Sequence, residues 1–540
     1  MSSVPDVSVV VAVYNTMPYL TDCLNSLVGQ TIGLDRLEVV AVDDGSTDDS
    51  GAELDRFAAR YPGTVKVIHQ ENSGGPAAPS NRALDVATGR YVYFIGSDDH
   101  LGEEALARMV GYADEHESDV VIGKMVGTNG RYVRQSLYLK NDPDVSLYGK
   151  ELPFALANTK LFRRELVEKH GLRFPEDMPV GSDQPFTIEA CVRSRRISVL
   201  GDYTCYYAVK RGDASNITYR ADHLARLRCV AAVMEHTAAL IEPGPDRDAV
   251  FKRHFTWEIS KLVQDDFTRL DRVTQSAVCE GVGRLVDAYL SDALRDSLGV
   301  KRRVRLLLAQ RGAVTELERA IREEGARGAP PFLLDKGRAF ARYPGLRDLG
   351  VALPDRAFEV LGEAVTGRMS AGTRLVSAHW EQNSDAMTFV LVARVPVVGE
   401  RSGVVARLAR GAMPDTADKP GARRLPAGHE LPAPVGEFAY EEAPDGSSTI
   451  LTARIPVDRA RSKRGVRVYA DVAGSTYEIP IRSKGVPLPL ARRWGQDDPY
   501  RASARTNPKG RLVVATAPLW EAPSGPGARL RRLLSRLKRK

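Results

Sequence analysis

The feature that most constrains the fold of this chain is an alternation of short β-branched runs with helical stretches between Val7 and about Leu200. Strands separated by helices of this length are typical of right-handed βαβ crossovers and a mainly parallel sheet. Such sheets bind ligands just past the carboxyl ends of their strands. The expected strands are 7–13, 37–42, 65–69 and 91–95, and the expected helices between them are 18–30, 48–61 and 78–87.

The remaining sequence changes character twice. Residues 222 to about 343 are rich in Leu, Ala and Arg at helical spacing, which predicts a helical module. From about 349 to 481, short strands alternate with turn clusters, which favours an all-β, Ig-like sandwich. The expected strands there are 388–397, 404–408, 449–455, 466–472 and 477–481, with a long loop at 416–434 and loosely structured linker at 484–527.

These changes predict four segments in the 540 residues. The α/β domain takes residues 1–219, the helical linker domain 220–348 and the β-rich domain 349–483, and residues 484–540 are linker and basic tail. A chain of this length is expected to form several domains.

Charge and cysteine content restrict the class of protein. The net charge is +7, and seven of the last twelve residues are basic with no acid among them, so the rest of the chain is neutral. A nucleic-acid-binding surface is therefore not expected. The longest apolar run, Val9–Val13, is too short to span a membrane, the N-terminus lacks signal-peptide features, and the five cysteines are scattered. We therefore expect a cytoplasmic protein.

Polar residues gather where the expected strands end. Tyr14 follows the first strand, the acidic run 43–48 closes the second, a Gly-rich turn at 72–75 follows the third, and Asp98 and Asp99 follow the fourth. Taken singly, these are ordinary helix caps, turns and helix starts. Together they lie at one sheet edge, where carboxylates are costly unless they hold a cation or accept hydrogen bonds.

Three stretches of this region resemble one family. VSVVVAVYN, VVAVDDGSTDDS and NSGGPAAPSNRALDVATGRYVYFIGSDD are similar to the motifs of family 2 glycosyltransferases, which have the Rossmann-like GT-A fold. The resemblance covers about the first 215 residues and implies a nucleotide-sugar pocket and a Mn²⁺ or Mg²⁺ ion that bridges the donor diphosphate. The implied pocket residues are Val13, Tyr14, Asp43, Asn72, Gly75, Arg82 and Asp98, and the implied metal ligands are Asp98 and Asp99.

The sequence departs from the family pattern at two places. The usual Asp-x-Asp is Gly96-Ser97-Asp98, which leaves Asp98 and Asp99 to hold the metal. The Arg-Asn pair often found in the pocket is Ser80-Asn81, and Arg82 is displaced by two positions.

The acceptor side of the site is implied further along the chain. By position in the resemblance, Asp183 takes the role of catalytic base, although it is also a suitable N-cap for the helix through Ile188. The two readings are compatible. Lys210 and Arg211 follow the last strand and are candidates for contact with the diphosphate, or else solvated surface charges. The Gln-x-x-Arg-Trp motif of processive synthases is absent, which argues against that activity.

The order of domains resembles bacterial wall teichoic acid sugar transferases, in which C-terminal sandwiches mediate oligomerisation. The resemblance implies an inverting, metal-dependent transfer from a nucleotide sugar, most simply UDP-linked, to a hydroxyl of a polyanionic cell-wall or exported polymer. One alternative is a catalytically impaired carbohydrate-binding scaffold, because Gly96 and Ser182 replace acids. A sugar-nucleotide pyrophosphorylase is disfavoured, because the first strand is not followed by a Gly-rich basic loop.

The basic tail has its own pattern. Leu530, Leu533, Leu534 and Leu537 fall on one face of a helix, surrounded by cations. This pattern is typical of a helix that lies on an anionic membrane and predicts peripheral attachment to the inner membrane face. A solvated tail and a segment that binds an anionic polymer are the alternatives.

Overall fold

The computed structural model describes residues 4–211, 222–336, 338–361, 364–382, 387–399, 405–408, 423–427, 436–446, 448–457, 462–472, 475–494 and 499–519. The chain divides into two compact units. The first contains residues 1–298 and 309–314, and the second contains 299–308 and 315–540.

An eight-stranded sheet organises the first unit, in the order β3-β2-β1-β4-β7-β6-β8-β5. The central strand β1 is parallel to both β2 and β4, and β7 is antiparallel to β4. The strands are β1 Val7–Val13, β2 Leu37–Asp43, β3 Val65–His69, β4 Tyr91–Gly96, β5 His100–Leu101, β6 Val120–Gly127, β7 Leu161–Arg163 and β8 Ile197–Ala208.

Helices cover both faces of this sheet, because successive strand residues point to opposite sides. Val9 packs in one core with residues of α1 and α2, whereas the neighbouring Val10 packs in a second core with residues of α3 and α6. The helices of this part are α1 Tyr19–Val28, α2 Ser50–Arg60, α3 Ala77–Leu84, α4 Ala105–Glu115, α5 Arg164–Lys169 and α6 Asp183–Arg193, with 3₁₀ turns at Ser136–Tyr138 and Leu152–Phe154.

The α/β architecture predicted for this region is confirmed. The strands predicted at 7–13 and 65–69 have those bounds, and the other two each extend one residue further. The predicted helices 18–30 and 48–61 are shorter at both ends in the structure.

A series of helices follows the eight-stranded sheet along the chain, as the composition of this region predicts. They are α8 His223–Leu240, α9 Pro245–Thr256, α10 Glu258–Leu262, α11 Arg272–Tyr289, α12 Asp292–Ser297, α13 Val300–Gln310 and α14 Val314–Arg327, with a 3₁₀ turn at Asp265–Arg269. Two strands, β9 Phe332–Asp335 and β10 Arg338–Ala341, lie inside the segment predicted to be helical. Because β9 also pairs with a strand at 397–399, this end of the predicted helical domain packs with the β-rich part.

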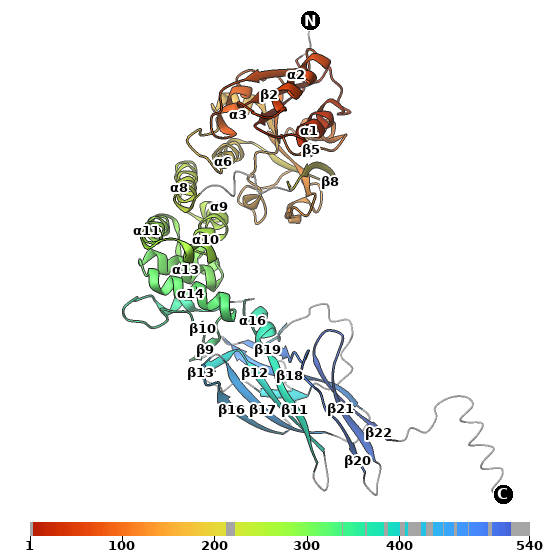
Figure 1. Cartoon of the computed structure of the whole chain (residues 1–540), viewed down its shortest axis with the longest axis vertical. Helices are drawn as coiled ribbons and strands as arrows, with labels where there is room; N and C mark the ends of the chain where they lie inside the picture. The colour runs from red at the N-terminus through yellow and green to blue at the C-terminus, as the bar shows by residue number, and fades with distance from the viewer. Residues whose placement is uncertain are drawn as a thin grey trace, which may run out of the picture. The chain divides into compact units, whose positions relative to one another are not determined.

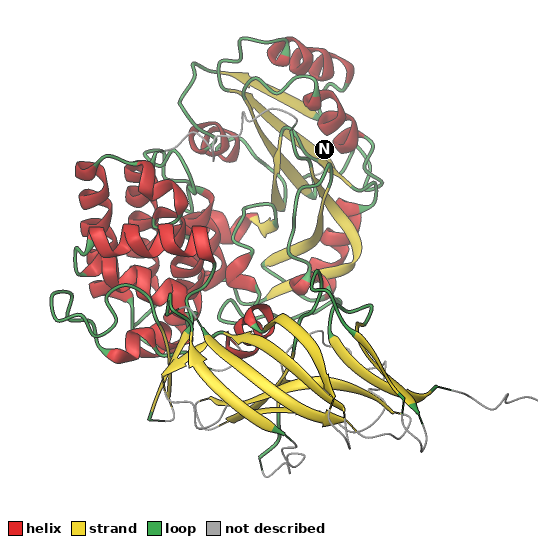
Figure 2. Ribbon diagram, turned by 60° about the horizontal axis from the view of Figure 1, so that its bottom comes forward, coloured by secondary structure: helices red, strands yellow, loops and turns green. Residues whose placement is uncertain are grey.

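The second unit is mainly antiparallel β-structure (Figure 2), as predicted. One sheet has the order β11-β12-β17-β16, and a larger one has the order β15-β19-β18-β22-β21-β20, with β14 beside β18. The strands are β11 Arg374–Gln382, β12 Met387–Val395, β13 Val397–Gly399, β14 Val405–Leu408, β15 Arg423–Arg424, β16 Glu437–Glu442, β17 Thr449–Val457, β18 Ser462–Val472, β19 Ser475–Pro480, β20 Leu490–Arg493, β21 Tyr500–Thr506 and β22 Leu512–Pro518. Helices α15 Asp355–Phe358 and α16 Ala364–Gly372 precede them.

The prediction of linker at 484–527 is wrong for residues 490–493, 500–506 and 512–518, which form β20, β21 and β22. Strand β21 shows why the pattern was weak. Its buried positions after Tyr500 are the small residues Ala502 and Ala504, while Arg501 and Arg505 are exposed. The predicted loop at 416–434 lies mostly outside the described residues, as does the leucine-containing tail. Within the described ranges, every helix is too short or too polar to cross a membrane.

Candidate functional site

The carboxyl ends of β1, β2 and β4 are joined by hydrogen bonds. Asn15, in the left-handed region at φ 47°, accepts hydrogen bonds through Oδ1 from the backbone N–H groups of Thr47 (2.7 Å) and Asp48 (3.2 Å). The Thr16 and Ser97 hydroxyls are 2.9 Å apart, which links β1 to the loop after β4. The polar strand ends predicted from sequence therefore meet at one edge of the sheet.

Asp43, predicted to hold the nucleotide, is fixed at the end of β2. Its carboxylate accepts a hydrogen bond from the Ser46 N–H at 3.0 Å and lies 3.0 Å from His69 Nδ1. Burial acts to raise the pKa of Asp43, but the bonds from Ser46 and His69 outweigh it and hold that pKa below its usual range. Asp43 is therefore an ionised hydrogen-bond acceptor at neutral pH.

The neighbouring Asp44 shapes the Gly-rich turn that contains Asn72 and Gly75. Its buried carboxylate accepts hydrogen bonds from the Ser73 N–H (3.1 Å) and the Ser73 hydroxyl (2.9 Å). Asn72 Nδ2 donates to the Asp44 carbonyl at 3.0 Å. Gly45 is required here, because its φ is +74° and a Cβ would lie 2.8 Å from the Asn72 backbone nitrogen. The sequence analysis placed Asp44 in the acidic run 43–48 without a separate role, and it missed His69.

The other predicted pocket residues differ in exposure. Val13 is buried at the end of β1, and its carbonyl accepts a hydrogen bond from the Asp44 N–H. Tyr14 is 44% exposed at the same edge. Arg82 is exposed on α3 and Lys210 is exposed after β8, and neither has an ion-pair partner among the described residues.

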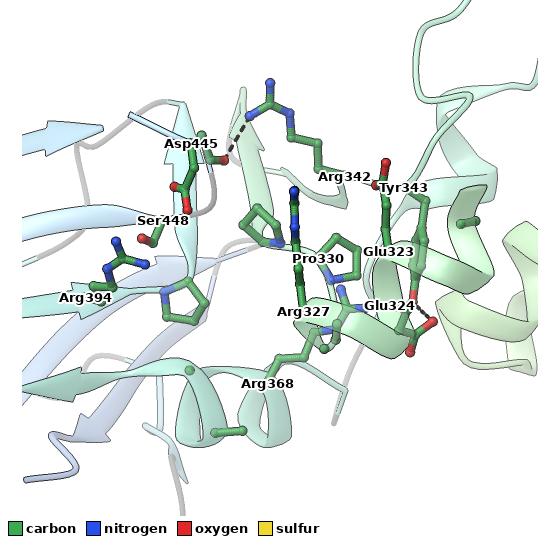
Figure 3. Close-up of a pocket in the computed structure, with 18 of the residues that line it drawn as sticks. Glu323, Glu324, Arg327, Pro330, Arg342, Tyr343, Arg368, Arg394, Asp445 and Ser448 are labelled. Carbon is green, nitrogen blue, oxygen red and sulfur yellow. Dashed lines mark hydrogen bonds between the residues drawn. The ribbon is translucent and has the colours of Figure 1, made fainter. Parts of the chain in front are cut away.

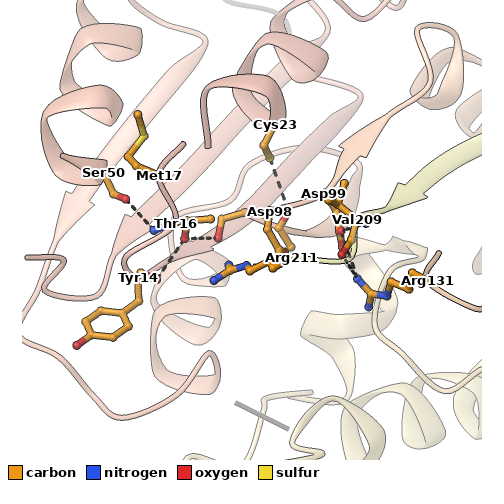
Figure 4. A network of polar contacts seen from close by, with 12 residues as sticks. Tyr14, Thr16, Met17, Cys23, Ser50, Asp98, Asp99, Arg131, Val209 and Arg211 are labelled. Atoms are coloured by element: carbon orange, nitrogen blue, oxygen red, sulfur yellow. Dashed lines mark hydrogen bonds and ion pairs between the residues drawn. The ribbon is translucent and has the colours of Figure 1, made fainter. Parts of the chain in front are cut away.

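Asp98 and Asp99 have different surroundings (Figure 4). The Asp98 carboxylate receives a hydrogen bond through Oδ2 from Arg211 Nε at 2.6 Å, and its Oδ1 accepts none among the described residues. Asp99 is 5% exposed. Its carboxylate accepts hydrogen bonds from the Tyr206 hydroxyl (2.6 Å) and the Val209 N–H (2.7 Å), and Arg131 lies 3.4 Å away. Burial and the charge of Asp98 raise the pKa of Asp99 to about 6.

Gly96 explains the departure from the Asp-x-Asp pattern. A Cβ at Gly96 would lie 3.0 Å from Asp99 Oδ2 and 3.1 Å from Asp98 Oδ1. A carboxylate at position 96 would therefore crowd the two that are present.

These carboxylates fit a divalent cation in one specific way. No cluster of three or more His, Cys, Asp or Glu side chains suited to a metal occurs in the part of the chain that the structure describes. Mg²⁺ and similar ions are commonly held by one or two carboxylates together with substrate phosphates. The unengaged Oδ1 of Asp98 suits that arrangement, whereas both oxygens of Asp99 already accept hydrogen bonds.

The predicted base Asp183 is the first residue of α6 and lines a cavity of about 560 Å³. Gly96 and Asn158 line the same cavity. Burial raises the pKa of Asp183, and the charges of Arg253 and Lys160 oppose that rise. The N-cap of α6 is Ser182, which makes no side-chain capping bond, so Asp183 is not the N-cap.

Two basic residues near Asp183 were missed by sequence reasoning. Lys160 is buried and donates through Nζ to the Ala155 carbonyl at 2.7 Å, and burial lowers its pKa to about 8. Arg253, from α9, donates to Gln184 Oε1 at 2.8 Å and pairs with Glu258 Oε1 at 2.9 Å. The helical segment therefore completes the cavity, which no local motif in the sequence indicates.

Comparison with known proteins identifies the class. Residues 8–171 match Glycosyl transferase family 2, and residues 224–321 match the Glycosyl transferase TarS linker domain. The α/β part of this chain is therefore a family 2 glycosyltransferase domain followed by a TarS-type linker, as the sequence resemblance indicated.

Individual relatives point to one branch of that family. The poly(ribitol-phosphate) beta-glucosyltransferase of Bacillus spizizenii is 39% identical over 214 residues, which are 39% of this chain and 34% of the relative. The match thus spans about a third of that protein. A crystal structure of S. aureus TarS 1-349 in complex with UDP-GlcNAc is 28% identical in sequence, with a TM-score of 0.57. The alignment covers 66% of this chain and 99% of the TarS chain. Longer S. aureus TarS shares the fold over 95% of this chain and 85% of its own, with a TM-score of 0.59 and 21% identity.

Proposed function

We propose that this chain transfers a sugar from a UDP-sugar to a hydroxyl of a polyol-phosphate polymer, with inversion at the anomeric carbon and with help from a divalent cation. The observation that carries the proposal is the cavity shared by Asp183 and Gly96. Gly96 ends β4, and the carboxylates of Asp98 and Asp99 lie close to it, so the proposed base and the proposed metal ligands are both near this cavity.

The donor end of the site suits a nucleotide diphosphate. The ionised Asp43 and the turn around Asn72 offer acceptors and backbone donors where the family binds its nucleotide. Arg211 lies on the Asp98 carboxylate, where it can also contact a phosphate oxygen. UDP is favoured because the TarS structure of similar fold was solved with UDP-GlcNAc.

Asp183 supplies the base in the transfer step. Its carboxylate takes the proton of the acceptor hydroxyl as that oxygen bonds to the anomeric carbon and the bond from that carbon to the diphosphate breaks. Attack opposite the leaving group inverts the configuration. Asp98, with the neighbouring Asp99, would hold Mn²⁺ or Mg²⁺. The cation would act as a Lewis acid and neutralise the negative charge of the leaving diphosphate. Arg253 keeps a positive charge near Asp183 and favours its ionised form.

The acceptor class rests on the name of the Bacillus relative, a poly(ribitol-phosphate) transferase. The test incubates the full chain with UDP-glucose or UDP-GlcNAc and synthetic poly(ribitol phosphate), with Mn²⁺ or with EDTA. We expect sugar incorporation that requires the polymer and the cation. Binding of UDP-sugar without transfer to the polymer or to water would instead identify the impaired scaffold considered above.

Two further partners are proposed with this function. The β-rich region 349–483 would mediate self-association, which light scattering on the full chain measures directly. The tail at 526–540 would bind the inner membrane surface through its cations and leucines. Salt-sensitive binding to anionic vesicles that persists after removal of residues 526–540 would contradict that attachment. Both partners are consistent with a cytoplasmic enzyme that works beside the membrane.

A further inference from the structure

A second cavity lies wholly within the second unit, between α14, β10, α16, β11 and β12 (Figure 3). Its volume is about 480 Å³, within the usual range for ligand sites. Five arginines line it, together with the carboxylates of Glu323, Glu324 and Asp445. The arginines are Arg327, Arg342, Arg368, Arg374 and Arg394.

The lining holds fewer carboxylates than arginines, three against five. Glu324 is already paired with Lys301 at 3.1 Å and Arg305 at 3.0 Å, both outside the cavity lining. Arg342 donates to the Gly446 carbonyl at 3.0 Å and pairs with Glu442, a carboxylate outside the lining, at 3.7 Å, which still leaves five arginines against four carboxylates. The cavity therefore keeps an excess of positive charge.

Two of the arginines face each other. Arg374 of β11 and Arg394 of β12 are directly opposed in the antiparallel register. Like charges in that position destabilise a sheet. Among the described residues neither has a carboxylate partner, so an anion between them would remove the repulsion.

Arg368 adds an unsatisfied donor. Its guanidinium stacks over Phe332 at 5.2 Å and Tyr343 at 5.6 Å, and its Nη2 donates to the Tyr343 hydroxyl at 3.2 Å. Its Nη1 is buried and has no hydrogen-bond partner in the described structure. Buried donors without a partner are rare and costly, and a ligand oxygen would satisfy this one.

The rest of the lining suits a flexible polyol better than a nucleotide. Pro330, Pro331, Pro344 and Pro396 present C–H surface beside the arginines. Tyr343 is the only aromatic ring in the lining of this described cavity, and Arg368 already stacks on it. A base would therefore find no free ring, whereas alternating phosphates and polyol carbons match alternating guanidinium groups and prolines.

We propose that this arginine-lined cavity, which belongs to the second unit, binds the phosphodiester backbone of the polyol-phosphate acceptor. The inference rests on the proposed acceptor class and extends it with a second contact to the same polymer. Arginine guanidinium groups bind phosphate oxygens with paired hydrogen bonds, so two or three of them can hold one segment of the chain.

The test measures binding of a fluorescent ribitol-phosphate oligomer to the full chain by anisotropy, without donor. The cavity variant is Arg327→Gln with Arg394→Gln. The matched control is Arg501→Gln with Arg505→Gln. These two arginines are exposed on β21, and replacing them removes the same amount of charge outside the cavity. We expect about a tenfold or greater loss of affinity in the cavity variant and little change in the control. Inorganic phosphate is added as competitor to separate a polymer site from a site for free phosphate.

The outcomes separate this inference from the proposed function. Equal oligomer binding by the cavity and control variants would overturn the inference, even with sugar transfer intact. Complete competition by low-millimolar inorganic phosphate would also overturn it, because the cavity would then be a free-phosphate site. If the wild-type chain transfers no sugar but binds the oligomer more tightly than the cavity variant does, the result would support the polymer site and reject the proposed transfer. In an active enzyme, the cavity variant should raise KM for long acceptors and leave kcat unchanged.

Discussion

Arg253 on α9 donates a hydrogen bond to Gln184 at 2.8 Å, immediately beside Asp183 at the start of α6. The bond joins a helix of the TarS-type linker to the cavity that Asp183 lines. Since Arg253 is the larger of the two nearby charges that oppose the raised pKa of Asp183, the linker helps to set the protonation of the proposed base.

Replacing Arg253 should therefore change the pH profile of transfer. In Arg253→Ala the pKa of Asp183 rises further, so the base stays protonated to higher pH and the acid limb of kcat/KM moves upward. A loss of roughly tenfold at neutral pH corresponds to about 1.4 kcal/mol in the barrier. Arg253→Lys should restore the profile in part, because it keeps the charge. Lys252→Ala on the same helix is the matched control, and an acid limb that moves equally in both alanine variants would contradict this role.

Asp183→Asn should abolish transfer with little effect on donor binding. The amide cannot take the acceptor proton, and removal of a general base typically costs about 10²–10⁴-fold in rate. Donor affinity, measured by calorimetry with UDP, should stay close to wild type, because the proposed donor contacts lie at the ends of β1, β2 and β4 and do not include Asp183. Near-wild-type turnover in Asp183→Asn would reject the assignment.

The metal prediction separates the two adjacent carboxylates. Asp98→Asn should lose most of the Mn²⁺-dependent part of UDP affinity, because Asp98 has the carboxylate oxygen that accepts no hydrogen bond in the described structure. Asp99→Asn should lose less, since Asp99 mainly holds Tyr206 and the Val209 N–H in place. Titration of UDP with Mn²⁺ or with EDTA gives the comparison. Unchanged Mn²⁺ dependence in both variants would place the cation elsewhere.

The sequence predicted the strands and the acids at their ends because both signals are local. Buried β-branched runs such as Val7–Val13 specify strands by themselves, and parallel strands bring their carboxyl ends to one edge. Arg253 was not predictable in this way, because it lies 69 residues after Gln184 and only tertiary packing brings the two together. Strand β21 was missed because its buried alanines give a weak alternation.

The environment of Asp99 predicts a specific effect of pH on stability. Its pKa is about 6 in the folded protein against a usual value of 3.8, so the folded state binds a proton more tightly than the unfolded state. The contribution of Asp99 to the free energy of unfolding is therefore fully present below pH 3.8 and is lost as pH rises through about 6. Between about pH 5 and pH 7.5 the loss amounts to about 1–2 kcal/mol.

Chemical denaturation of the full chain at about pH 5 and at about pH 7.5 should show this loss of stability, and Asp99→Asn should remove this part of the pH dependence. Asp114→Asn provides the comparison, because hydrogen bonds from Arg90 and Tyr91 outweigh burial and hold the pKa of Asp114 below its usual value. If wild type and Asp99→Asn lose the same stability over this range, the folded carboxyl does not titrate near pH 6.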